Sequence, residues 1–235
     1  MNIKKNDIVV LSDIHIPFED DDALEAALDV IERFKPSVVV LLGDVLDFFT
    51  ISSHERDPAR GETLQYEIDA GIMFFRRLRS IVPDSRIPYV LGNHEDRLRR
   101  WIWKNKDIAS LRALDFDALL ETATYGIETT PYNKDVVMGG VQFRHGKSCG
   151  VSAGPRNLGE SGMSGVSGHT HKLSRESITR RAGVHTWIQT GCLCDLSPDW
   201  INGTANWQHG FAIGDMIDGQ YFLRPVEIHK GVALI

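Results

Sequence analysis

The stretch that decides the fold is Val38-Val39-Val40-Leu41-Leu42-Gly43-Asp44, an apolar run that ends in a glycine and a carboxylate. Two similar runs flank it: Ile8-Val9-Val10-Leu11 leads to Asp13, and Pro88-Tyr89-Val90-Leu91 leads to Gly92-Asn93-His94-Glu95. Apolar, mostly β-branched runs of this kind indicate buried strands of a parallel sheet. The polar residues after them therefore lie at strand carboxyl ends, where open α/β sheets place their functional sites.

Two histidine motifs farther along the chain, His145-Gly146 and Gly168-His169-Thr170-His171, add imidazoles to this set. Asp13 and His15 are two residues apart, so in an extended segment their side chains point the same way. Oxygen and imidazole ligands that converge from several strand ends form a transition-metal site, and this many can hold two ions. An unpaired carboxylate at Asp44 would be costly to bury, although an aspartate after Gly43 could also cap a turn or helix.

Length and composition favour an ordinary soluble protein. The 235 residues are 42% hydrophobic and 25% charged, with a formal charge of −6, and we expect one domain over residues 1–235. The acidic balance argues against a broad electrostatic grip on nucleic acid. The sequence has no apolar signal region and no run approaching the roughly 18 apolar residues of a membrane span. We therefore expect a cytoplasmic protein without a membrane partner.

The three cysteines, Cys149, Cys192 and Cys194, have no spacing typical of a disulfide framework, a zinc knuckle or a redox pair. We interpret them as small residues in or near strands.

Helices and strands alternate in the first half of the chain, and shorter strands fill the second half. The predicted strands are 8–12, 38–42, 87–91, 135–145, 163–168, 173–181, 184–191, 207–217 and 220–228. One predicted helix begins at the acidic residues 19–22, a second spans 63–82, and a third covers about 95–122 with a break near 105–107. Gly139-Gly140 and Asp218-Gly219 are turn signals. Residues 146–162, rich in glycine and serine, are expected to form a long loop beside the site.

The order and spacing of the five polar motifs resemble the calcineurin-like metallophosphoesterases, from Asp13 to His171. The resemblance implies an α/β fold with four αββα layers, in which two mixed sheets pack face to face with helices outside. The alternation of elements is consistent with this architecture.

The resemblance also implies a ligand set. One ion would be held by Asp13, His15, Asp44 and His171, and the other by Asp44, Asn93, His145 and His169, so that Asp44 bridges the two. Mixed nitrogen and oxygen ligands suit Mn²⁺, Fe²⁺/Fe³⁺, Co²⁺, Ni²⁺ or Zn²⁺, and the sequence does not choose among them.

His94 corresponds to the catalytic histidine of the family, near the leaving-group oxygen. The alternative is a turn histidine with a structural hydrogen bond. In the implied mechanism two cations lower the pKa of a bridging water, the resulting hydroxide attacks phosphorus, and His94 stabilises or protonates the leaving oxygen.

Candidate substrate contacts are Phe48, His54, Arg97 and Lys147. Protein serine/threonine phosphatases of the family carry an arginine where this chain has Phe48, and such an arginine favours a dianionic monoester. The aromatic residue therefore favours a diester, although Arg97 or Lys147 could supply a positive contact. His54 lies in the polar segment 51–62, about ten residues past Asp44.

The basic segment after Glu95, which contains Trp101 and Trp103, could contact a nucleic-acid strand by charge and stacking. Alternatively it is an amphipathic helix with solvated arginines.

We therefore predict a two-metal enzyme that hydrolyses phosphodiester bonds in nucleic acid, nucleotides or small phosphate diesters. The alternatives are a small-molecule phosphomonoesterase and an inactive scaffold with the same fold. The sequence gives no oligomeric state.

Overall fold

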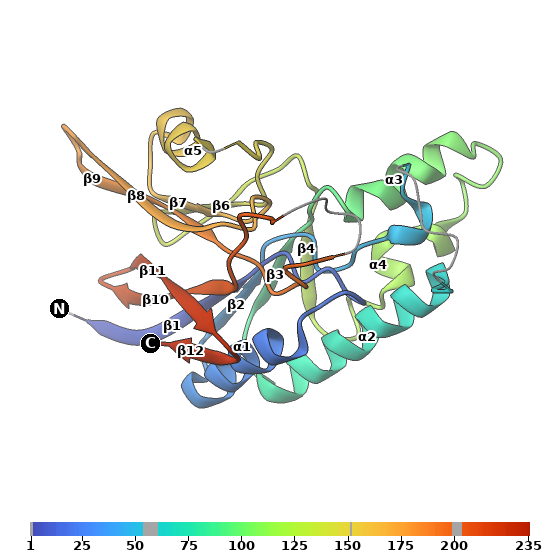
Figure 1. The fold of residues 1–235 in the computed structure, drawn as a ribbon, viewed down its shortest axis with the longest axis horizontal. Coiled ribbons are helices and arrows are strands. Elements are labelled where there is room, and N and C mark those ends of the chain that lie inside the picture. The colour runs from blue at the N-terminus through green and yellow to red at the C-terminus, as the bar shows by residue number, and fades with distance from the viewer. Residues whose placement is uncertain (1, 54–60, 151, 199–203) are drawn as a thin grey trace.

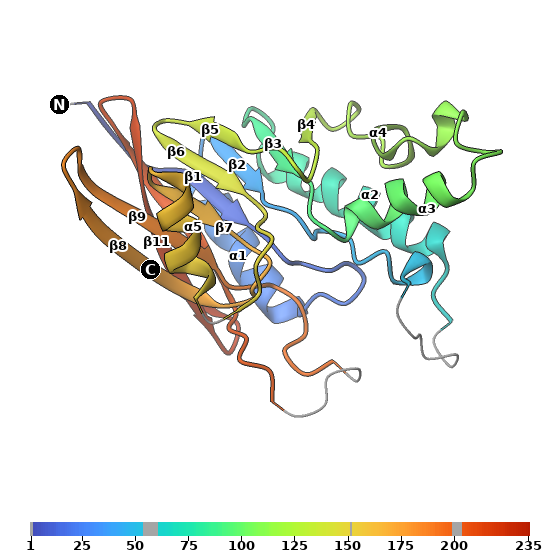
Figure 2. The ribbon, with the colours of Figure 1, turned by 90° about the horizontal axis from the view of Figure 1, so that it is seen from above.

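A computed structural model of the chain describes residues 2–53, 61–150, 152–198 and 204–235. Two mixed β-sheets pack face to face, and helices cover their outer faces (Figure 1). This arrangement confirms the four-layer αββα sandwich that the sequence predicts. Figure 2 shows the same layers from above, with α3 and α4 at the end of the molecule remote from β8 and β9.

The first sheet carries the strands that the apolar runs predict. Its seven strands lie in the order β12 (Val232–Leu234), β11 (Gln220–His229), β10 (Gly210–Ile217), β1 (Ile3–Leu11), β2 (Val38–Leu41), β3 (Ile87–Val90) and β4 (Ile127–Thr130). The strands β1 to β4 are parallel, whereas β10 pairs antiparallel with β1, and β11 and β12 continue antiparallel. The carboxyl ends of β1, β2 and β3 therefore lie at one edge.

The second sheet is smaller. Its five strands lie in the order β5 (Val136–Met138), β6 (Val141–Arg144), β7 (Gly165–Ser167), β9 (Gly183–Thr190) and β8 (Leu173–Arg180). The inner strands β6, β7 and β9 are parallel, and the outer pairs β5–β6 and β8–β9 are antiparallel.

Alternate residues of the buried strands face two separate cores. In β1, Ile8 and Val10 pack with Phe143 and Val166 of the second sheet, in the cluster between the sheets. Val9 and Leu11 belong instead to the larger cluster under the helices. Because successive strand residues point to opposite faces, a strand covered on both sides must be apolar throughout, as β1 and β2 are here.

The helices are α1 (Asp21–Phe34), α2 (Leu64–Ile81), α3 (Glu95–Lys104), α4 (Phe116–Leu119) and α5 (Ala153–Ser161), with short 3₁₀ helices η1 (Phe49–Ile51) and η2 (Arg112–Leu114). Asp20 caps α1 by accepting a hydrogen bond from the amide of Ala23, which fits the acidic start predicted there. Among the helices described, none has the length and apolar composition needed to cross a bilayer.

Both predicted turns are confirmed, since positive φ angles occur at Gly139 and Gly140 and at Asp218 and Gly219, between β5 and β6 and between β10 and β11.

Three predictions differ from the structure. The segment 146–162 is not a continuous loop, because it contains α5, which ends at Gly162 in the left-handed conformation with φ 71°. The predicted break near 105–107 is confirmed, since α3 ends at Lys104, but the rest of the predicted helix to residue 122 forms only η2 and the single turn α4. The edge strands β4 and β12 were not predicted, since each is too short to show an alternating pattern.

Candidate metal centre

Five strand ends from both sheets meet at one site. Asp13 and His15 follow β1, Asp44 follows β2, and Asn93 follows β3, all from the first sheet. The second sheet contributes His145 after β6, and His169 and His171 after β7. The structure therefore brings together all seven predicted ligand residues, from segments up to 158 residues apart (13 to 171).

The backbone of five of these residues is left-handed rather than extended, and this conformation directs their side chains into the site. Positive φ angles occur at Asp13 (52°), His15 (57°), Asp44 (49°), His169 (70°) and His171 (55°). The expectation that Asp13 and His15 point together along an extended segment is therefore wrong. Their backbone turns after Leu11, and their amides donate to the carbonyl oxygens of Gly43 and Asp44 at 3.0 Å each. Non-glycine residues in this conformation cost free energy and cluster at functional sites.

One group of donors surrounds Asp44. The Nε2 atom of His145 lies 3.1 Å from Asp44 Oδ2 and 3.0 Å from Asn93 Oδ1. Asp44, His145 and His169 together form a group of donor atoms that could hold a metal ion. The other ring nitrogen of His145, Nδ1, donates to the carbonyl oxygen of Leu42 at 2.8 Å, so Nε2 is the nitrogen that faces the centre and would bind a metal.

A second group of donors surrounds His15. Its Nε2 atom lies 3.2 Å from His171 Nε2 and 3.9 Å from Asp44 Oδ2, while His171 Nε2 lies 3.3 Å from Asp13 Oδ1. His15 Nδ1 donates to Asp47 Oδ2 at 2.9 Å, which again directs Nε2 into the centre. Asp44 belongs to a possible donor group with His15 and His94 and to another with His145 and His169, so it borders both sets of donors. His171 belongs to the side of His15, and His169 to the side of His145.

The spacing of these atoms fits a shared cation. Donors bound at about 2.1 Å around a tetrahedral ion lie roughly 3.4 Å apart. The facing Nε2 atoms of His15 and His171 are 3.2 Å apart, at a distance where two imidazoles need a cation or a proton between them. The donor set of carboxylates, an amide oxygen and imidazoles suits a divalent transition metal.

The charges of the buried side chains also favour a cation at this site. Burial works against ionisation of Asp44, yet His145 and His94 hold the pKa of its carboxyl well below the usual range. Burial likewise opposes protonation of His145 and His171, but Asp44 raises the pKa of His145 to about 10, and Asp13 raises that of His171 to about 10. Two buried carboxylates here require positive charge beside them, and either bound cations or protonated histidines can supply it.

His94 lies beside this centre and contacts Asp47 and Arg97. Its Nδ1 atom lies 2.9 Å from the carbonyl oxygen of Asp47, and its Nε2 atom accepts from Arg97 Nη2 at 3.0 Å. The backbone amide of His94 donates to Asp44 Oδ1 at 2.9 Å. Burial opposes protonation of His94, but Asp44 and Asp47 raise its pKa above the ordinary value. His94 is only partly buried, so its ring borders the open side of the centre.

Glu95 is a supporting residue to which the sequence reasoning gave no role. Its buried carboxylate accepts hydrogen bonds from the amides of Asp44, Leu46 and Gly92 at 2.7–3.0 Å and from the hydroxyl of Tyr89 at 2.6 Å. One side chain therefore fixes the loops after β2 and β3. Glu95 directly follows His94 in the motif, and this position was the sequence signal that could have indicated its role.

Two positions in the motifs have no room for a side chain larger than that of glycine. A Cβ atom at Gly92 would collide with the carboxylate of Asp44, and one at Gly43 would collide with the ring of His145. Gly43 also has φ 85°, which side-chain-bearing residues rarely adopt.

The four predicted substrate contacts have different outcomes. Phe48 is fully buried and packs beside Phe116 with ring centroids 6.3 Å apart, so the expected substrate contact is wrong. Its left-handed backbone, with φ 51°, belongs to the turn that places the ring in the core. Arg97 lies at the site, Lys147 is exposed two residues after His145, and His54 falls outside the described residues.

Two thiols lie closer to the centre than the sequence indicated. The exposed Cys149 has its Sγ atom 2.9 Å from His169 Nε2, and the buried Cys194 has its Sγ atom 3.8 Å from His171 Nδ1. Cys194 also belongs to a possible donor group with His15 and His171. The spacing Cys192-Leu193-Cys194 carries no metal signature, because the tertiary fold alone brings Cys194 to the histidines.

Comparison with known proteins agrees with this geometry. Residues 7–173 match the calcineurin-like phosphoesterase family, and the chain belongs to that family. It is 27% identical over 224 residues to the Gene 54 protein of Mycobacterium phage D29, covering 88% of this chain and 87% of the relative. It is 26% identical over 232 residues to the Gene 54 protein of Mycobacterium phage L5, covering 91% and 90%.

Among solved structures, the chain is similar to Vacuolar Protein Sorting 29 from Cryptosporidium parvum. The TM-score is 0.51 at 14% identity, with 97% of this chain and 93% of that chain covered. At this level of identity the similarity concerns the fold.

Proposed function

We propose that this chain hydrolyses phosphodiester bonds with two divalent transition-metal ions shared across Asp44. The observation that carries the proposal is the convergence of seven candidate ligand side chains around Asp44, which belongs to one possible donor group with His145 and His169 and to another with His15 and His94. Asp13, His15 and His171 would hold one ion, and Asn93, His145 and His169 the other. Two such ions would supply a hydroxide nucleophile at neutral pH and polarise the phosphoryl oxygens.

The residues around the ligands would position the reacting groups. The amide of His94 and the carboxylate of Glu95 hold the loops of Asp44 and Asn93 in place. The ring of His94, on the open side of the centre, would face the leaving-group oxygen and stabilise or protonate it. Its contact with Asp47 fixes the orientation of the ring.

The proposed preference for a diester rests on the positively charged side chains near the centre. The position where phosphatases of the family carry a phosphate-gripping arginine is Phe48, whose side chain lies in the core. Arg97 is already engaged, since its guanidinium donates to the carbonyl oxygen of Asp47 at 2.9 Å and to His94 Nε2 at 3.0 Å. A diester carries one negative charge, so it requires less cationic support than a monoester.

Bis(4-nitrophenyl) phosphate and 4-nitrophenyl phosphate, compared at one pH with Mn²⁺, test this proposal. We expect the diester to have the higher kcat/KM. A monoester preference of tenfold or more would favour the phosphomonoesterase alternative, in which Arg97 leaves His94 to grip the phosphate. Absence of both activities in protein loaded with Mn²⁺, Zn²⁺, Co²⁺, Ni²⁺ or Fe²⁺ would favour the scaffold alternative.

We also propose that residues 1–235 form a single domain, that the protein is cytoplasmic, and that its natural substrates are nucleotides or nucleic acid.

A further inference from the structure

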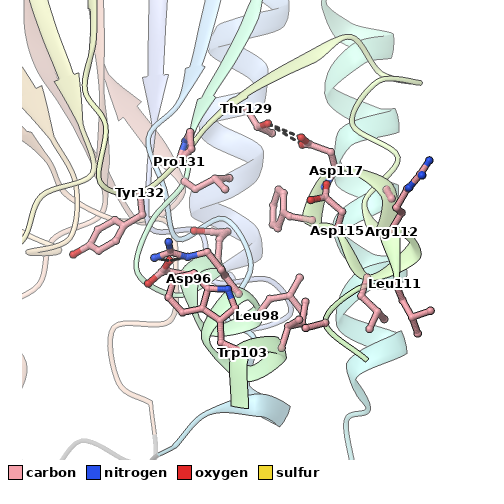
Figure 3. A pocket seen from close by; sticks show the side chains of 18 of the residues that line it. Asp96, Leu98, Trp103, Leu111, Arg112, Asp115, Asp117, Thr129, Pro131 and Tyr132 are labelled. Atoms are coloured by element: carbon pink, nitrogen blue, oxygen red, sulfur yellow. Dashed lines mark hydrogen bonds and ion pairs between the residues drawn. The ribbon is translucent and has the colours of Figure 1, made fainter. Parts of the chain in front are cut away.

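A cavity of about 940 Å³ lies next to the metal centre, between α3, the segment before α4 and the loop after β4 (Figure 3). This volume is in the range of ligand-binding pockets. Its walls include the side chains of Leu98, Ile102, Trp103, Leu111 and Phe116. Neither the ligand set nor His94 accounts for this cavity.

Tyr132 connects the cavity to the metal centre. It lines the cavity, and its ring centroid is 6.1 Å from that of His145. Leu91 and Glu95, which flank the Asn93-His94 pair, line the cavity as well. A phosphate held at the centre therefore has the cavity beside it, within reach of one of its two organic groups.

The aromatic surface of the cavity suits a planar group. Trp103 is 59% exposed, so a ligand in the cavity can reach its side chain. The guanidinium of Arg99 lies over this indole at 4.5 Å and is held by an ion pair with the buried Asp96, so the stack is fixed before any ligand arrives. Preformed stacking surfaces favour flat aromatic ligands.

The exposed carboxylates of the cavity favour an uncharged group over a second phosphate. The acidic residues Glu95, Asp96, Asp115 and Asp117 and the basic residues Arg99 and Arg112 line it, but the carboxylate of Glu95 accepts from the amides of the metal-centre loops. Arg99 and Arg100 share the single carboxylate of Asp96, whereas Asp115 and Asp117 are exposed at the wall opposite Tyr132 (Figure 3). An uncharged group with N–H donors fits such a surface, because carboxylates accept hydrogen bonds from exocyclic amino groups.

From these observations we propose that the cavity binds a nucleobase with an exocyclic amino group, so that the substrate is a nucleotide phosphodiester. This inference rests on the proposed phosphodiesterase activity and names its substrate class. Trp103 supplies the stacking surface, and Tyr132 separates the base from the metal centre. Asp115 caps α4 with Oδ1, and its Oδ2 accepts from the amino group, whereas both oxygens of Asp117 accept from threonine hydroxyls.

Three diesters with the same leaving group test the proposal: cytidine 5′-(4-nitrophenyl phosphate), its uridine counterpart, and methyl 4-nitrophenyl phosphate. All three carry one negative charge and release nitrophenolate, and the two bases differ at C4, where cytosine has an amino group and uracil an oxygen, and at N3, which carries a hydrogen only in uracil. We expect kcat/KM to be at least tenfold higher for the cytidine ester than for the methyl ester, with the uridine ester between them. Equal values for all three esters would overturn the proposal.

Two variants locate the effect. Trp103→Ala should lower kcat/KM for the cytidine ester at least fivefold and leave the methyl ester within twofold. Asp115→Asn, which keeps a residue able to cap α4, should reduce the preference for cytidine over uridine. Phe222→Ala is the matched control, since this aromatic residue is 54% exposed on β11, away from the cavity. Equal effects of Trp103→Ala on both esters would contradict the cavity as the base site.

Equilibrium dialysis with cytidine 5′-monophosphate separates this inference from the proposed function. Binding that Trp103→Ala weakens at least fivefold, in a protein that hydrolyses none of the diesters, would retain the base site and reject the phosphodiesterase. Hydrolysis of all three esters with no binding of the monophosphate would retain the enzyme and reject the base site.

Discussion

The guanidinium of Arg97 donates a hydrogen bond to the ring of His94, with Nη2 3.0 Å from Nε2. An arginine can only donate, so Nε2 of His94 is the acceptor in this arrangement. The opposite nitrogen, Nδ1, faces the carbonyl oxygen of Asp47 at 2.9 Å, which can only accept. The observed geometry is therefore that of a neutral His94 protonated on Nδ1. To act as an acid at the leaving oxygen, His94 must carry a proton on Nε2. Arg97 must then move away from that nitrogen.

This contact predicts a shift in the pH dependence of activity. Burial and the positive charge of Arg97 oppose the rise in the pKa of His94 that Asp44 and Asp47 cause, so Arg97→Leu should raise that pKa further and keep His94 protonated to higher pH. If His94 acts as an acid, the alkaline limb of the kcat profile on an alkyl diester moves to higher pH. Arg100→Leu, on the same helix and paired with Asp96, is the control and should leave the profile in place. A shift to lower pH would contradict the assigned contact.

His94→Ala should lower kcat by about 10²–10⁴ on diesters with poor leaving groups, because the leaving oxygen loses its proton donor. An activated aryl diester should lose less, since nitrophenolate leaves without a proton. Metal analysis of the variant should give the same content as the parent protein. A loss of metal, or equal losses on both substrates, would show that His94 acts as a ligand or a structural residue instead.

Replacement of the shared carboxylate tests the number of metal ions. The parent protein should bind two ions per chain, and Asp44→Ala should lose at least one, because Asp44 Oδ2 lies near both His15 and His145. His229→Ala, at an exposed position on β11, should bind the same number of ions as the parent. Elemental analysis and anomalous scattering measure this, and a single ion with Asp44 unligated would reject the two-metal centre.

Metal binding should become tighter as pH rises. The pKa values of His145 and His171, raised to about 10, mean that both rings hold protons at neutral pH in the metal-free protein. An ion must displace these protons, so its apparent affinity should rise by up to about tenfold per pH unit for each proton displaced. Calorimetry in two buffers of different ionisation enthalpy measures the release. Affinity that is constant from pH 6 to pH 8 would contradict this prediction.

The same shift has a stability consequence of definite sign. Because the folded-state pKa values exceed the ordinary value of 6.5, the stabilisation from these histidines is complete below about pH 6.5 and is lost as pH rises through about 10. The denaturation midpoint of the metal-free protein should therefore fall over that interval.

Glu95→Gln should destabilise the metal-free protein by about 1–3 kcal/mol, because the amide group of glutamine would place N–H donors against the donors that the carboxylate now accepts. Urea denaturation measures the change. Glu160→Gln, at an exposed position on α5, is the matched control and should stay within about 0.5 kcal/mol of the parent. Equal stability of the Glu95 variant and the parent would mean that Glu95 does not hold the loops together.

The sequence alone determined the parallel strands and the positions of the polar residues that follow them, for a local physical reason. A strand covered on both faces must be apolar along its whole length, so 38–42 and 8–11 are recognisable without any tertiary information. A glycine or turn with a polar residue after such a strand marks its carboxyl end. Asp13, Asp44 and Asn93 could therefore be placed at one sheet edge before the structure was known.

Only the tertiary structure decided how those residues meet and what surrounds them. The left-handed backbone at Asp13 and His15 is stabilised by hydrogen bonds to the loop after β2, and these depend on the pairing of two strands. Phe48 illustrates the same limit, because its motif position suggested a substrate contact while the turn directs its ring into the core. Cys194 reaches His171, and Tyr132 reaches His145, from segments 23 and 13 residues away. Contacts between distant segments depend on the packing of the whole chain, and a local pattern of residues does not contain that information.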